Sequence, residues 1–181
     1  AVAARDALAA DARAERSERA CARALALPEL AGAGTVMLFA SFRSEIDTAP
    51  LIRGCLARGI AVALPRIAGP RLLEAAAVAD PERDLVPGTW DIPEPRAESS
   101  TVDPGLIDLV FVPGTAFSAS GGRCGYGGGF YDAFLPRLRP DTPLVGLAFE
   151  AQMVDDVPCE PHDLTLDVVV TEARVIRCRA A

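Results

Sequence analysis

The fold is decided by residues 107–132, which read I-D-L-V-F-V-P-G-T-A-F-S-A-S-G-G-R-C-G-Y-G-G-G-F-Y-D. The apolar run at 107–112 predicts a buried strand, and residues 130–139 can form a helix. Protein backbones often bind phosphate where a strand, a glycine loop and a helix start follow one another, because glycine lets consecutive N–H groups turn toward one anion. The segment therefore predicts an α/β fold with an anion site at this loop.

The glycine spacing does not fit the common nucleotide-binding motifs. Gly125, Gly127 and Gly129 alternate, whereas a dinucleotide-binding GxGxxG places its third glycine one position later and needs an acidic residue on the next strand. The P-loop requires a lysine, and this chain contains none. A plain strand-to-helix turn is the alternative, but it needs one or two glycines rather than six. If phosphate binds here, Arg123 and backbone amides supply the positive charge.

Strand and helix patterns alternate on both sides of this segment. Helices are predicted at residues 1–26, 49–58 and 130–139. Strands are predicted at 35–40, 60–64, 72–78, 107–112, 144–149, 168–170 and 174–178, with a surface loop over 80–104. This alternation predicts an α/β fold with three α/β/α layers and a mostly parallel sheet, in one domain spanning residues 1–181.

The composition excludes several classes of protein. Half of the 181 residues are apolar, which suits a globular chain. The net charge of −7 and dispersed arginines disfavour a nucleic-acid partner, and no window reaches the ~20 apolar residues of a membrane span. Five cysteines without CxxC spacing are typical of reduced thiols. We expect a cytoplasmic monomer that binds a small molecule.

Few residues can carry chemistry. The single histidine, His162, and the absence of lysine disfavour a Ser-His-Asp triad, a Schiff base and a histidine-rich metal site. Asp132, directly after the glycines, and Asp163 on a late loop are candidates for Mg²⁺ beside phosphate oxygens. The alternatives are a favourable charge in a first helical turn for Asp132 and an ordinary loop residue for Asp163.

Three further residues could either contact a ligand or have a purely structural role. Glu45 follows the predicted strand at 35–40 and can point into the same cleft as the glycine loop. Trp90, in a proline-rich segment, either presents an aromatic face to a planar ligand or pins a surface loop by its burial. Cys124 is expected to pack, buried or half-buried, since only Arg123 is adjacent to hold a thiolate.

Together these motifs resemble the 5-formyltetrahydrofolate cyclo-ligase family, also called methenyltetrahydrofolate synthetases. The segment P-G-x-A-F-x-x-x-G-x-R-x-G-Y-G-G-G-F-Y-D looks like the signature of that family. Residues 45–48 match its E-I-D-T element and residues 92–95 its I-x-E-P element, while Gln152, Pro158 and His162-Asp163 match its late motif. The resemblance covers nearly the whole chain.

The resemblance implies an activity and a fold. The reaction is the ATP- and Mg²⁺-dependent conversion of 5-formyltetrahydrofolate to 5,10-methenyltetrahydrofolate with release of ADP and phosphate. The family route phosphorylates the formyl oxygen, after which N10 closes the ring and phosphate leaves. Phosphoryl transfer depends on positioning and charge neutralisation, so a chain poor in histidine and lysine can perform it. The implied architecture is that of the NagB, ribose-5-phosphate isomerase and CoA-transferase group.

The resemblance also assigns roles to individual residues. It makes Arg123, Tyr131 and Asp132 catalytic, assigns folate to Glu45, Trp90 and Tyr126, and assigns magnesium to Asp132 and Asp163. The implied ATP-binding residues are Arg5, Arg123, Cys124, Gly125, Tyr126, Gly127, Gly128, Gly129, Phe130 and Tyr131.

Four positions depart from the family pattern. Ala1 and Ala4 stand where the family has lysine and leucine, Cys124 replaces a leucine, and Phe130 replaces the first tyrosine of Y-Y-D. The missing lysine motivates the alternative of a non-catalytic folate- or nucleotide-binding homologue. Sugar-phosphate isomerase chemistry ranks last, because its acid/base lysine is absent.

Overall fold

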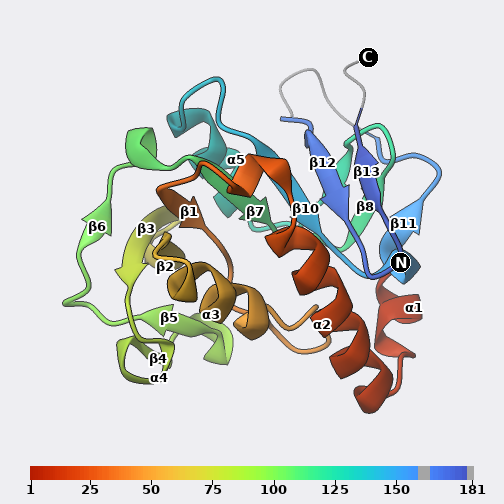
Figure 1. Cartoon of the computed structure of the whole chain (residues 1–181), viewed down its shortest axis with the longest axis horizontal. Coiled ribbons are helices and arrows are strands. Elements are labelled where there is room, and N and C mark those ends of the chain that lie inside the picture. The colour runs from red at the N-terminus through yellow and green to blue at the C-terminus, as the bar shows by residue number, and fades with distance from the viewer. Residues whose placement is uncertain (159–163, 179–181) are drawn as a thin grey trace.

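The computed structural model describes residues 1–158 and 164–178, and its centre is one large sheet (Figure 1). Eight strands lie in the order β13-β12-β10-β7-β1-β2-β3-β6. Their bounds are β13 (Val175–Arg177), β12 (Val168–Val170), β10 (Leu144–Leu147), β7 (Leu109–Val112), β1 (Thr35–Met37), β2 (Ala61–Gly69), β3 (Leu72–Val78) and β6 (Thr101–Val102). The four pairs from β12 to β2 are parallel and the other three are antiparallel, so the prediction of a mostly parallel sheet is confirmed.

Each face of the sheet packs against its own hydrophobic cluster. Along β7 the side chains alternate, with Leu109 and Phe111 in one cluster and Val110 and Val112 in the other. The helices α2 (Ala10–Leu25) and α3 (Ala49–Ala57) lie side by side over the first cluster (Figure 1). The short helix α5 (Phe130–Phe134) and the 3₁₀ turn η4 (Leu135–Arg137) contribute to the second. Helical elements therefore cover both faces, as the alternation predicts.

The predicted long helix at residues 1–26 is wrong, because the chain breaks into α1 (Val2–Asp6) and α2. Ala9, before α2, has an extended backbone with φ −60° and ψ 151°. Alanine-rich sequence favours helix throughout this region, so local propensity does not explain the break. Tertiary contacts do: Leu8 packs against the first cluster, and Arg5 of α1 is only 3% exposed among loops from elsewhere in the chain.

Residues 80–104 do not form the predicted surface loop. They fold into α4 (Pro81–Asp84), an antiparallel ribbon of β4 (Leu85–Pro87) and β5 (Pro93–Pro95), the 3₁₀ turn η2 (Thr89–Asp91), and the edge strand β6. Asp80 begins α4, since its Oδ1 accepts a hydrogen bond from the Glu82 N–H at 3.1 Å. The prolines that suggested a loop stand instead at helix and strand ends, where their missing N–H costs little.

Several predicted boundaries also shift. The predicted helix at 130–139 ends as an α-helix at Phe134, because Pro136 has no N–H to donate, and the chain continues as the 3₁₀ turn η4. β1 and β10 are shorter than predicted, whereas β2 continues to Gly69. The strand at 72–78 and the last strand pair are confirmed. No helix of the described part of the chain combines the length and apolar character that a membrane span needs.

Candidate functional site

A cleft of about 790 Å³ lies beyond the carboxyl ends of β1 and β7. Four segments line it: the loop after β1, the β2–β3 hairpin, the β4–β5 ribbon, and residues 123–132. Loops after parallel strands meet at one edge of a sheet, which is where α/β proteins bind ligands. Glu45, Trp90 and every residue from 123 to 132 line this cleft, so the structure brings most of the predicted site residues together.

One predicted site residue, Arg5, lies outside the cleft lining, and another, Asp163, is not among the described residues. Arg5 does not line the cleft, but its Nη1 donates to the Tyr126 hydroxyl at 2.8 Å. Asp163, together with His162 of the same motif, lies outside the described residues. Gln152 of the late motif is buried, and its Nε2 donates to the Gly114 carbonyl at 2.9 Å, which fixes the start of the segment that enters the cleft.

The six glycines between residues 121 and 129 serve two different structures. Gly121 and Gly122 form the turn between β8 (Ala116–Ser118) and β9 (Arg123–Cys124), where the Ser118 N–H donates to the Gly122 carbonyl at 3.0 Å. Only the glycines at 125–129 line the cleft. Gly127 and Gly129 have φ of 85° and 66°, a left-handed geometry that favours glycine. The ligand-facing loop is therefore shorter than the glycine count indicates.

Arg123 and Asp132 form an ion pair across the loop. Arg123 Nη2 lies 2.6 Å from Asp132 Oδ1, and the arginine side chain is 8% exposed whereas the aspartate is 60% exposed. Arg123 Nη1 also donates to the Pro113 carbonyl at 3.4 Å. The Nε of Arg123 is buried without any hydrogen-bond partner among the described residues. A buried donor without a partner costs free energy, so a ligand acceptor here would remove that cost.

The Tyr131 hydroxyl is a second buried group without a hydrogen-bond partner in the described chain. Its ring also lies beneath the Arg123 guanidinium, 6.0 Å from the ring centre. Burial raises the pKa of Tyr131, and the nearby charge of Glu45 raises it further. Tyr131 therefore remains protonated at neutral pH and can donate a hydrogen bond to a ligand oxygen.

Glu45 belongs to a network that reaches back to α1. Its Oε2 accepts from the Phe42 N–H at 2.9 Å, and its carboxyl shares a hydrogen bond with Tyr126, which accepts in turn from Arg5. Arg5 Nε donates to Ser44 Oγ at 3.0 Å. Burial raises the pKa of Glu45 despite these partners, and burial followed by the charge of Glu45 raises the pKa of Tyr126 to about 12. The network holds a carboxylate at the cleft wall.

Trp90 lies at the rim of the cleft and is 64% exposed, so the prediction of a loop pinned by a buried tryptophan is wrong. Its ring meets Phe130 edge to face, with centres 6.4 Å apart. The buried residue of this segment is Glu94, whose two oxygens accept from the N–H groups of Thr89 and Ile67 at 2.9 and 3.1 Å. Sequence reasoning gave Glu94 no role. The I-P-E-P element was its only signal.

Cys124 also differs from expectation, because it is exposed in the cleft rather than packed in the interior. Left-handed backbone gathers around the same cleft. Of residues 1–158 and 164–178, the non-glycine residues with positive φ are Arg43, Arg71, Trp90 and Asp91. Such geometry costs about 1–3 kcal/mol per residue and is concentrated at functional sites. None of these conformations can be read from residue identity.

Of the two predicted magnesium ligands, the structure describes Asp132. No group of three or more His, Cys, Asp or Glu side chains in residues 1–158 and 164–178 is placed to hold a metal ion. Asp132 alone offers an exposed carboxylate in the cleft beside the glycine loop. One or two carboxylates with substrate phosphates and water are the usual ligands of Mg²⁺, so Asp132 fits this ion if a nucleotide binds beside it.

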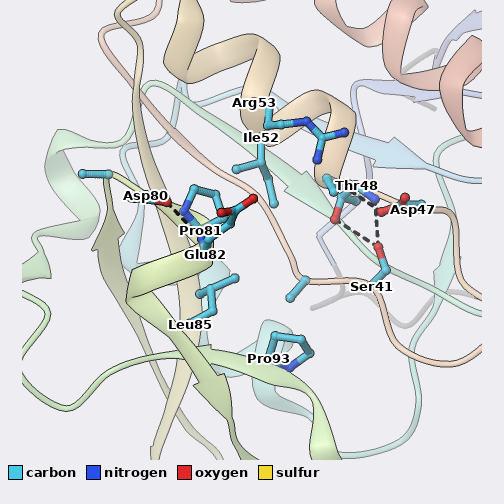
Figure 2. Close-up of a pocket in the computed structure, with 13 residues that line it drawn as sticks. Ser41, Asp47, Thr48, Ile52, Arg53, Asp80, Pro81, Glu82, Leu85 and Pro93 are labelled. Carbon is cyan, nitrogen blue, oxygen red and sulfur yellow. Dashed lines mark hydrogen bonds between the residues drawn. The ribbon is translucent and has the colours of Figure 1, made fainter.

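A second cavity of about 490 Å³ adjoins the cleft at Ala40 (Figure 2). At one side of it the Ser41 and Thr48 hydroxyls are 3.1 Å apart, and at the other Asp80 accepts from the Glu82 N–H. Asp47 accepts from the Ala49 N–H at 3.0 Å. These contacts begin helices and hold loops, so Ser41, Asp47, Thr48 and Asp80 already have partners.

Comparison with known proteins gives concordant results. The model of the 5-formyltetrahydrofolate cyclo-ligase family matches residues 2–172. A 5-formyltetrahydrofolate cyclo-ligase of Escherichia coli is 35% identical over 167 residues, which cover 89% of this chain and 90% of that protein. The NMR structure of Aquifex aeolicus 5,10-methenyltetrahydrofolate synthetase is similar with a TM-score of 0.86 and 32% identity, over 99% of this chain and 90% of that one. A Mycoplasma pneumoniae 5,10-methenyltetrahydrofolate synthetase, at 20% identity, shares the fold with a TM-score of 0.76 over 94% and 93% of the two chains.

Proposed function

Because the chain belongs to the 5-formyltetrahydrofolate cyclo-ligase family, we propose that it converts 5-formyltetrahydrofolate to 5,10-methenyltetrahydrofolate, using ATP and magnesium and releasing ADP and phosphate. It is an enzyme of the ligase class that forms a carbon–nitrogen bond. The observation that carries the proposal is the pair of buried, unpartnered donors, Arg123 Nε and Tyr131 OH, on the loop that lines the cleft.

The nucleotide fits the loop side of the cleft. Phosphate oxygens are acceptors, and Arg123, Tyr131 and the glycine backbone at 125–129 offer donors. Arg123 also carries a positive charge. Its partner Asp132 is largely exposed to solvent, which weakens the neutralisation of that charge. Arg5 supports this side indirectly, since it fixes the Tyr126 hydroxyl.

The folate fits the opposite wall. The pterin ring has N–H donors along one edge, and the Glu45 carboxylate is an acceptor held at the wall by the Phe42 N–H and Tyr126. Trp90 and Phe130 form an edge-to-face pair at the rim, which offers aromatic surface to a planar ring system. This arrangement supports the proposal that Glu45, Trp90 and Tyr126 contact the substrate.

The proposed reaction needs positioning more than a reactive side chain. The formyl oxygen attacks the γ-phosphorus of ATP, and ADP leaves. N10 then attacks the activated carbon and the ring closes, the N10 proton passes to water, and the phosphate leaves with the former formyl oxygen. In the first step Arg123 stabilises negative charge on the transferred group, while Tyr131 donates a hydrogen bond to an oxygen in the cleft. No proton acceptor stronger than a carboxylate is required.

Magnesium would be held by Asp132 and, on the resemblance, by Asp163. When bound, it neutralises phosphate charge and fixes the orientation of the phosphate chain. The observed Arg123–Asp132 pair positions the carboxylate beside the glycine loop, where it lines the cleft.

Three finer statements belong to the proposal. We assign the fold to the NagB, ribose-5-phosphate isomerase and CoA-transferase group, supported by the central mixed sheet covered on both faces. We place the enzyme in the cytoplasm, supported by four free cysteines in the described residues. We also propose that the monomer is active, because the described residues proposed to bind ATP and folate line one continuous cleft.

The direct test is an assay of the purified protein with 5-formyltetrahydrofolate and MgATP. We expect the methenyl chromophore and ADP to appear in equal amounts. Ligand binding by calorimetry without either product would indicate the binding-only homologue that the absent lysine suggested. Absence of both binding and turnover would overturn the proposed function.

The magnesium assignment is tested by Asp132→Asn. Asp132 is 60% exposed, so the substitution is expected to leave the melting temperature within about 2 °C of wild type. We expect kcat to fall by about tenfold to a hundredfold and the magnesium concentration at half-maximal rate to rise. Unchanged kcat and magnesium dependence would exclude Asp132 as a ligand.

A further inference from the structure

Arg71 lies outside the glycine loop in sequence but touches it in space. It occupies the two-residue turn of the β2–β3 hairpin, between Gly69 and Leu72. A Cβ built on Gly129 would come within 2.5 Å of Arg71 Nη2 and 3.0 Å of its Nε. The guanidinium can therefore approach the loop backbone only because residue 129 has no side chain. Gly129 itself lines the cleft.

The Arg71 guanidinium has no hydrogen bond or ion pair with any residue in 1–158 or 164–178. Neighbouring arginines differ in this respect. Arg66 of the same hairpin pairs with Glu74 at 3.1 Å, and Arg123 pairs with Asp132. Because a guanidinium carries five N–H donors and no acceptor, Arg71 is left free to bind an anion beside the loop.

The charge balance of the cleft calls for such a cation. Among the described residues that line it are three carboxylates, Glu45, Glu94 and Asp132, and only two guanidiniums, Arg43 and Arg123. Even with the magnesium proposed at Asp132, a further cation close by would favour a triphosphate in a lining with this excess of negative charge. Arg71 is adjacent to the loop and is not neutralised, so it supplies the missing charge.

The backbone of Arg71 adds an independent indication. Its φ is 55°, in the left-handed region that glycine adopts without cost. A glycine at this position would suit the turn better, so the arginine side chain is retained there at the expense of conformational free energy. Strained residues of this kind are concentrated where a side chain binds a ligand.

We propose that Arg71 is a phosphate-binding residue of this enzyme, which contacts the ATP phosphates from the hairpin side while Arg123 contacts them from within the loop. The inference rests on the proposed use of ATP. It adds a second, non-contiguous segment to the nucleotide site. It also gives two reasons for a glycine at residue 129, namely its φ of 66° and the approach of Arg71.

The test compares Arg71→Ala with Arg53→Ala by calorimetry. Arg53 is the matched control, since it is an exposed arginine that lines the second cavity (Figure 2). We expect Arg71→Ala to raise the Kd for ATP about tenfold or more and to leave the Kd for adenosine, which lacks phosphate, unchanged. The Kd of Arg53→Ala for ATP should stay within about twofold of wild type.

Arg71→Gly separates binding from stability. Glycine relieves the left-handed backbone, so this variant should melt at or above the wild-type temperature and yet bind ATP as weakly as Arg71→Ala. If Arg71 only stabilised the fold, Arg71→Gly would give the opposite result. Its melting temperature would fall, and its preference for ATP over adenosine would match wild type. That outcome, or equal losses for ATP and adenosine, would overturn the proposal.

Failure of the inference is distinct from failure of the proposed function. Wild-type protein that uses ATP, together with an Arg71→Ala variant of unchanged ATP affinity and KM, rejects only the role of Arg71. Wild-type protein that neither binds nor consumes ATP rejects both.

Discussion

The cleft and the smaller cavity of Figure 2 share Ala40 but differ in how their polar groups are satisfied. In the cavity, two hydroxyls donate to backbone carbonyls, those of Ser41 and Thr48. Two carboxylates accept from backbone N–H groups, those of Asp47 and Asp80. In the cleft, by contrast, Arg123 and Tyr131 keep buried donors without partners, and Glu45 is held at a raised pKa.

This difference teaches how to distinguish a binding site from a hollow between packed elements. Polar residues that begin helices gain their hydrogen bonds when the chain folds, so they have little to offer a ligand. Polar groups left without partners cost stability and regain it only when something binds. The cleft therefore differs from the cavity in the donors that folding leaves unpaired, and not in size alone.

Removal of the unpaired donor should have the largest effect. Arg123→Ala removes a buried charge and the Nε donor from the loop, and we expect kcat/KM for ATP to fall by about a hundredfold to a thousandfold, the range for loss of one charge-stabilising group. The KM for folate should change much less. Steady-state kinetics with each substrate varied in turn would measure both, and a larger loss for folate would reassign the loop.

Glu45→Gln should weaken folate binding by about tenfold to a hundredfold, the range for a hydrogen bond to a charged group. The thermal stability of the variant at neutral pH should rise rather than fall. Because burial raises the Glu45 pKa, ionisation destabilises the native state as pH rises from the unfolded-state pKa, about 4.3, through the folded-state pKa. The variant should therefore melt above wild type at neutral pH, and the two should converge toward pH 4. Melting curves that differ equally at pH 4 and 7 would contradict this assignment.

The smallest effect on activity is expected in the cavity. Asp80→Ala removes the oxygen that accepts from the Glu82 N–H, so the free energy of unfolding should fall by about 0.5–2 kcal/mol. KM values for ATP and folate should remain within about twofold of wild type. Denaturant unfolding and the methenyl assay would test this, and a raised KM for folate would show that the cavity receives part of the substrate.

Sequence reasoning predicted the features that depend on local pattern. Apolar runs such as 72–78 and 168–170 are strands because they are buried on both faces of the sheet. The gathering of Glu45 and the glycine loop followed from the position of loops after strands, whereas the place of Trp90 followed from the family resemblance. The roles of these residues remain predictions for the experiments above.

The features that sequence reasoning missed depend on contacts between distant segments. The break at Ala9 arises from the packing of Leu8 and the burial of Arg5, not from helix propensity. The hairpin turn at Gly121 and Gly122 looks like part of a phosphate loop until its pairing is known. The approach of Arg71 to Gly129 has no signal at all in the linear sequence.

The bond from Arg5 to the Tyr126 hydroxyl joins residues 121 positions apart, and its companion to Ser44 spans 39. During synthesis, α1 leaves the ribosome long before its partner at residue 126 exists. Contacts of such sequence separation form slowly, because the intervening chain must first be ordered. The wall of the cleft that contains Glu45 and Tyr126 is thus expected to be completed late in folding, so that a ligand which recognises this wall would select chains whose folding has finished.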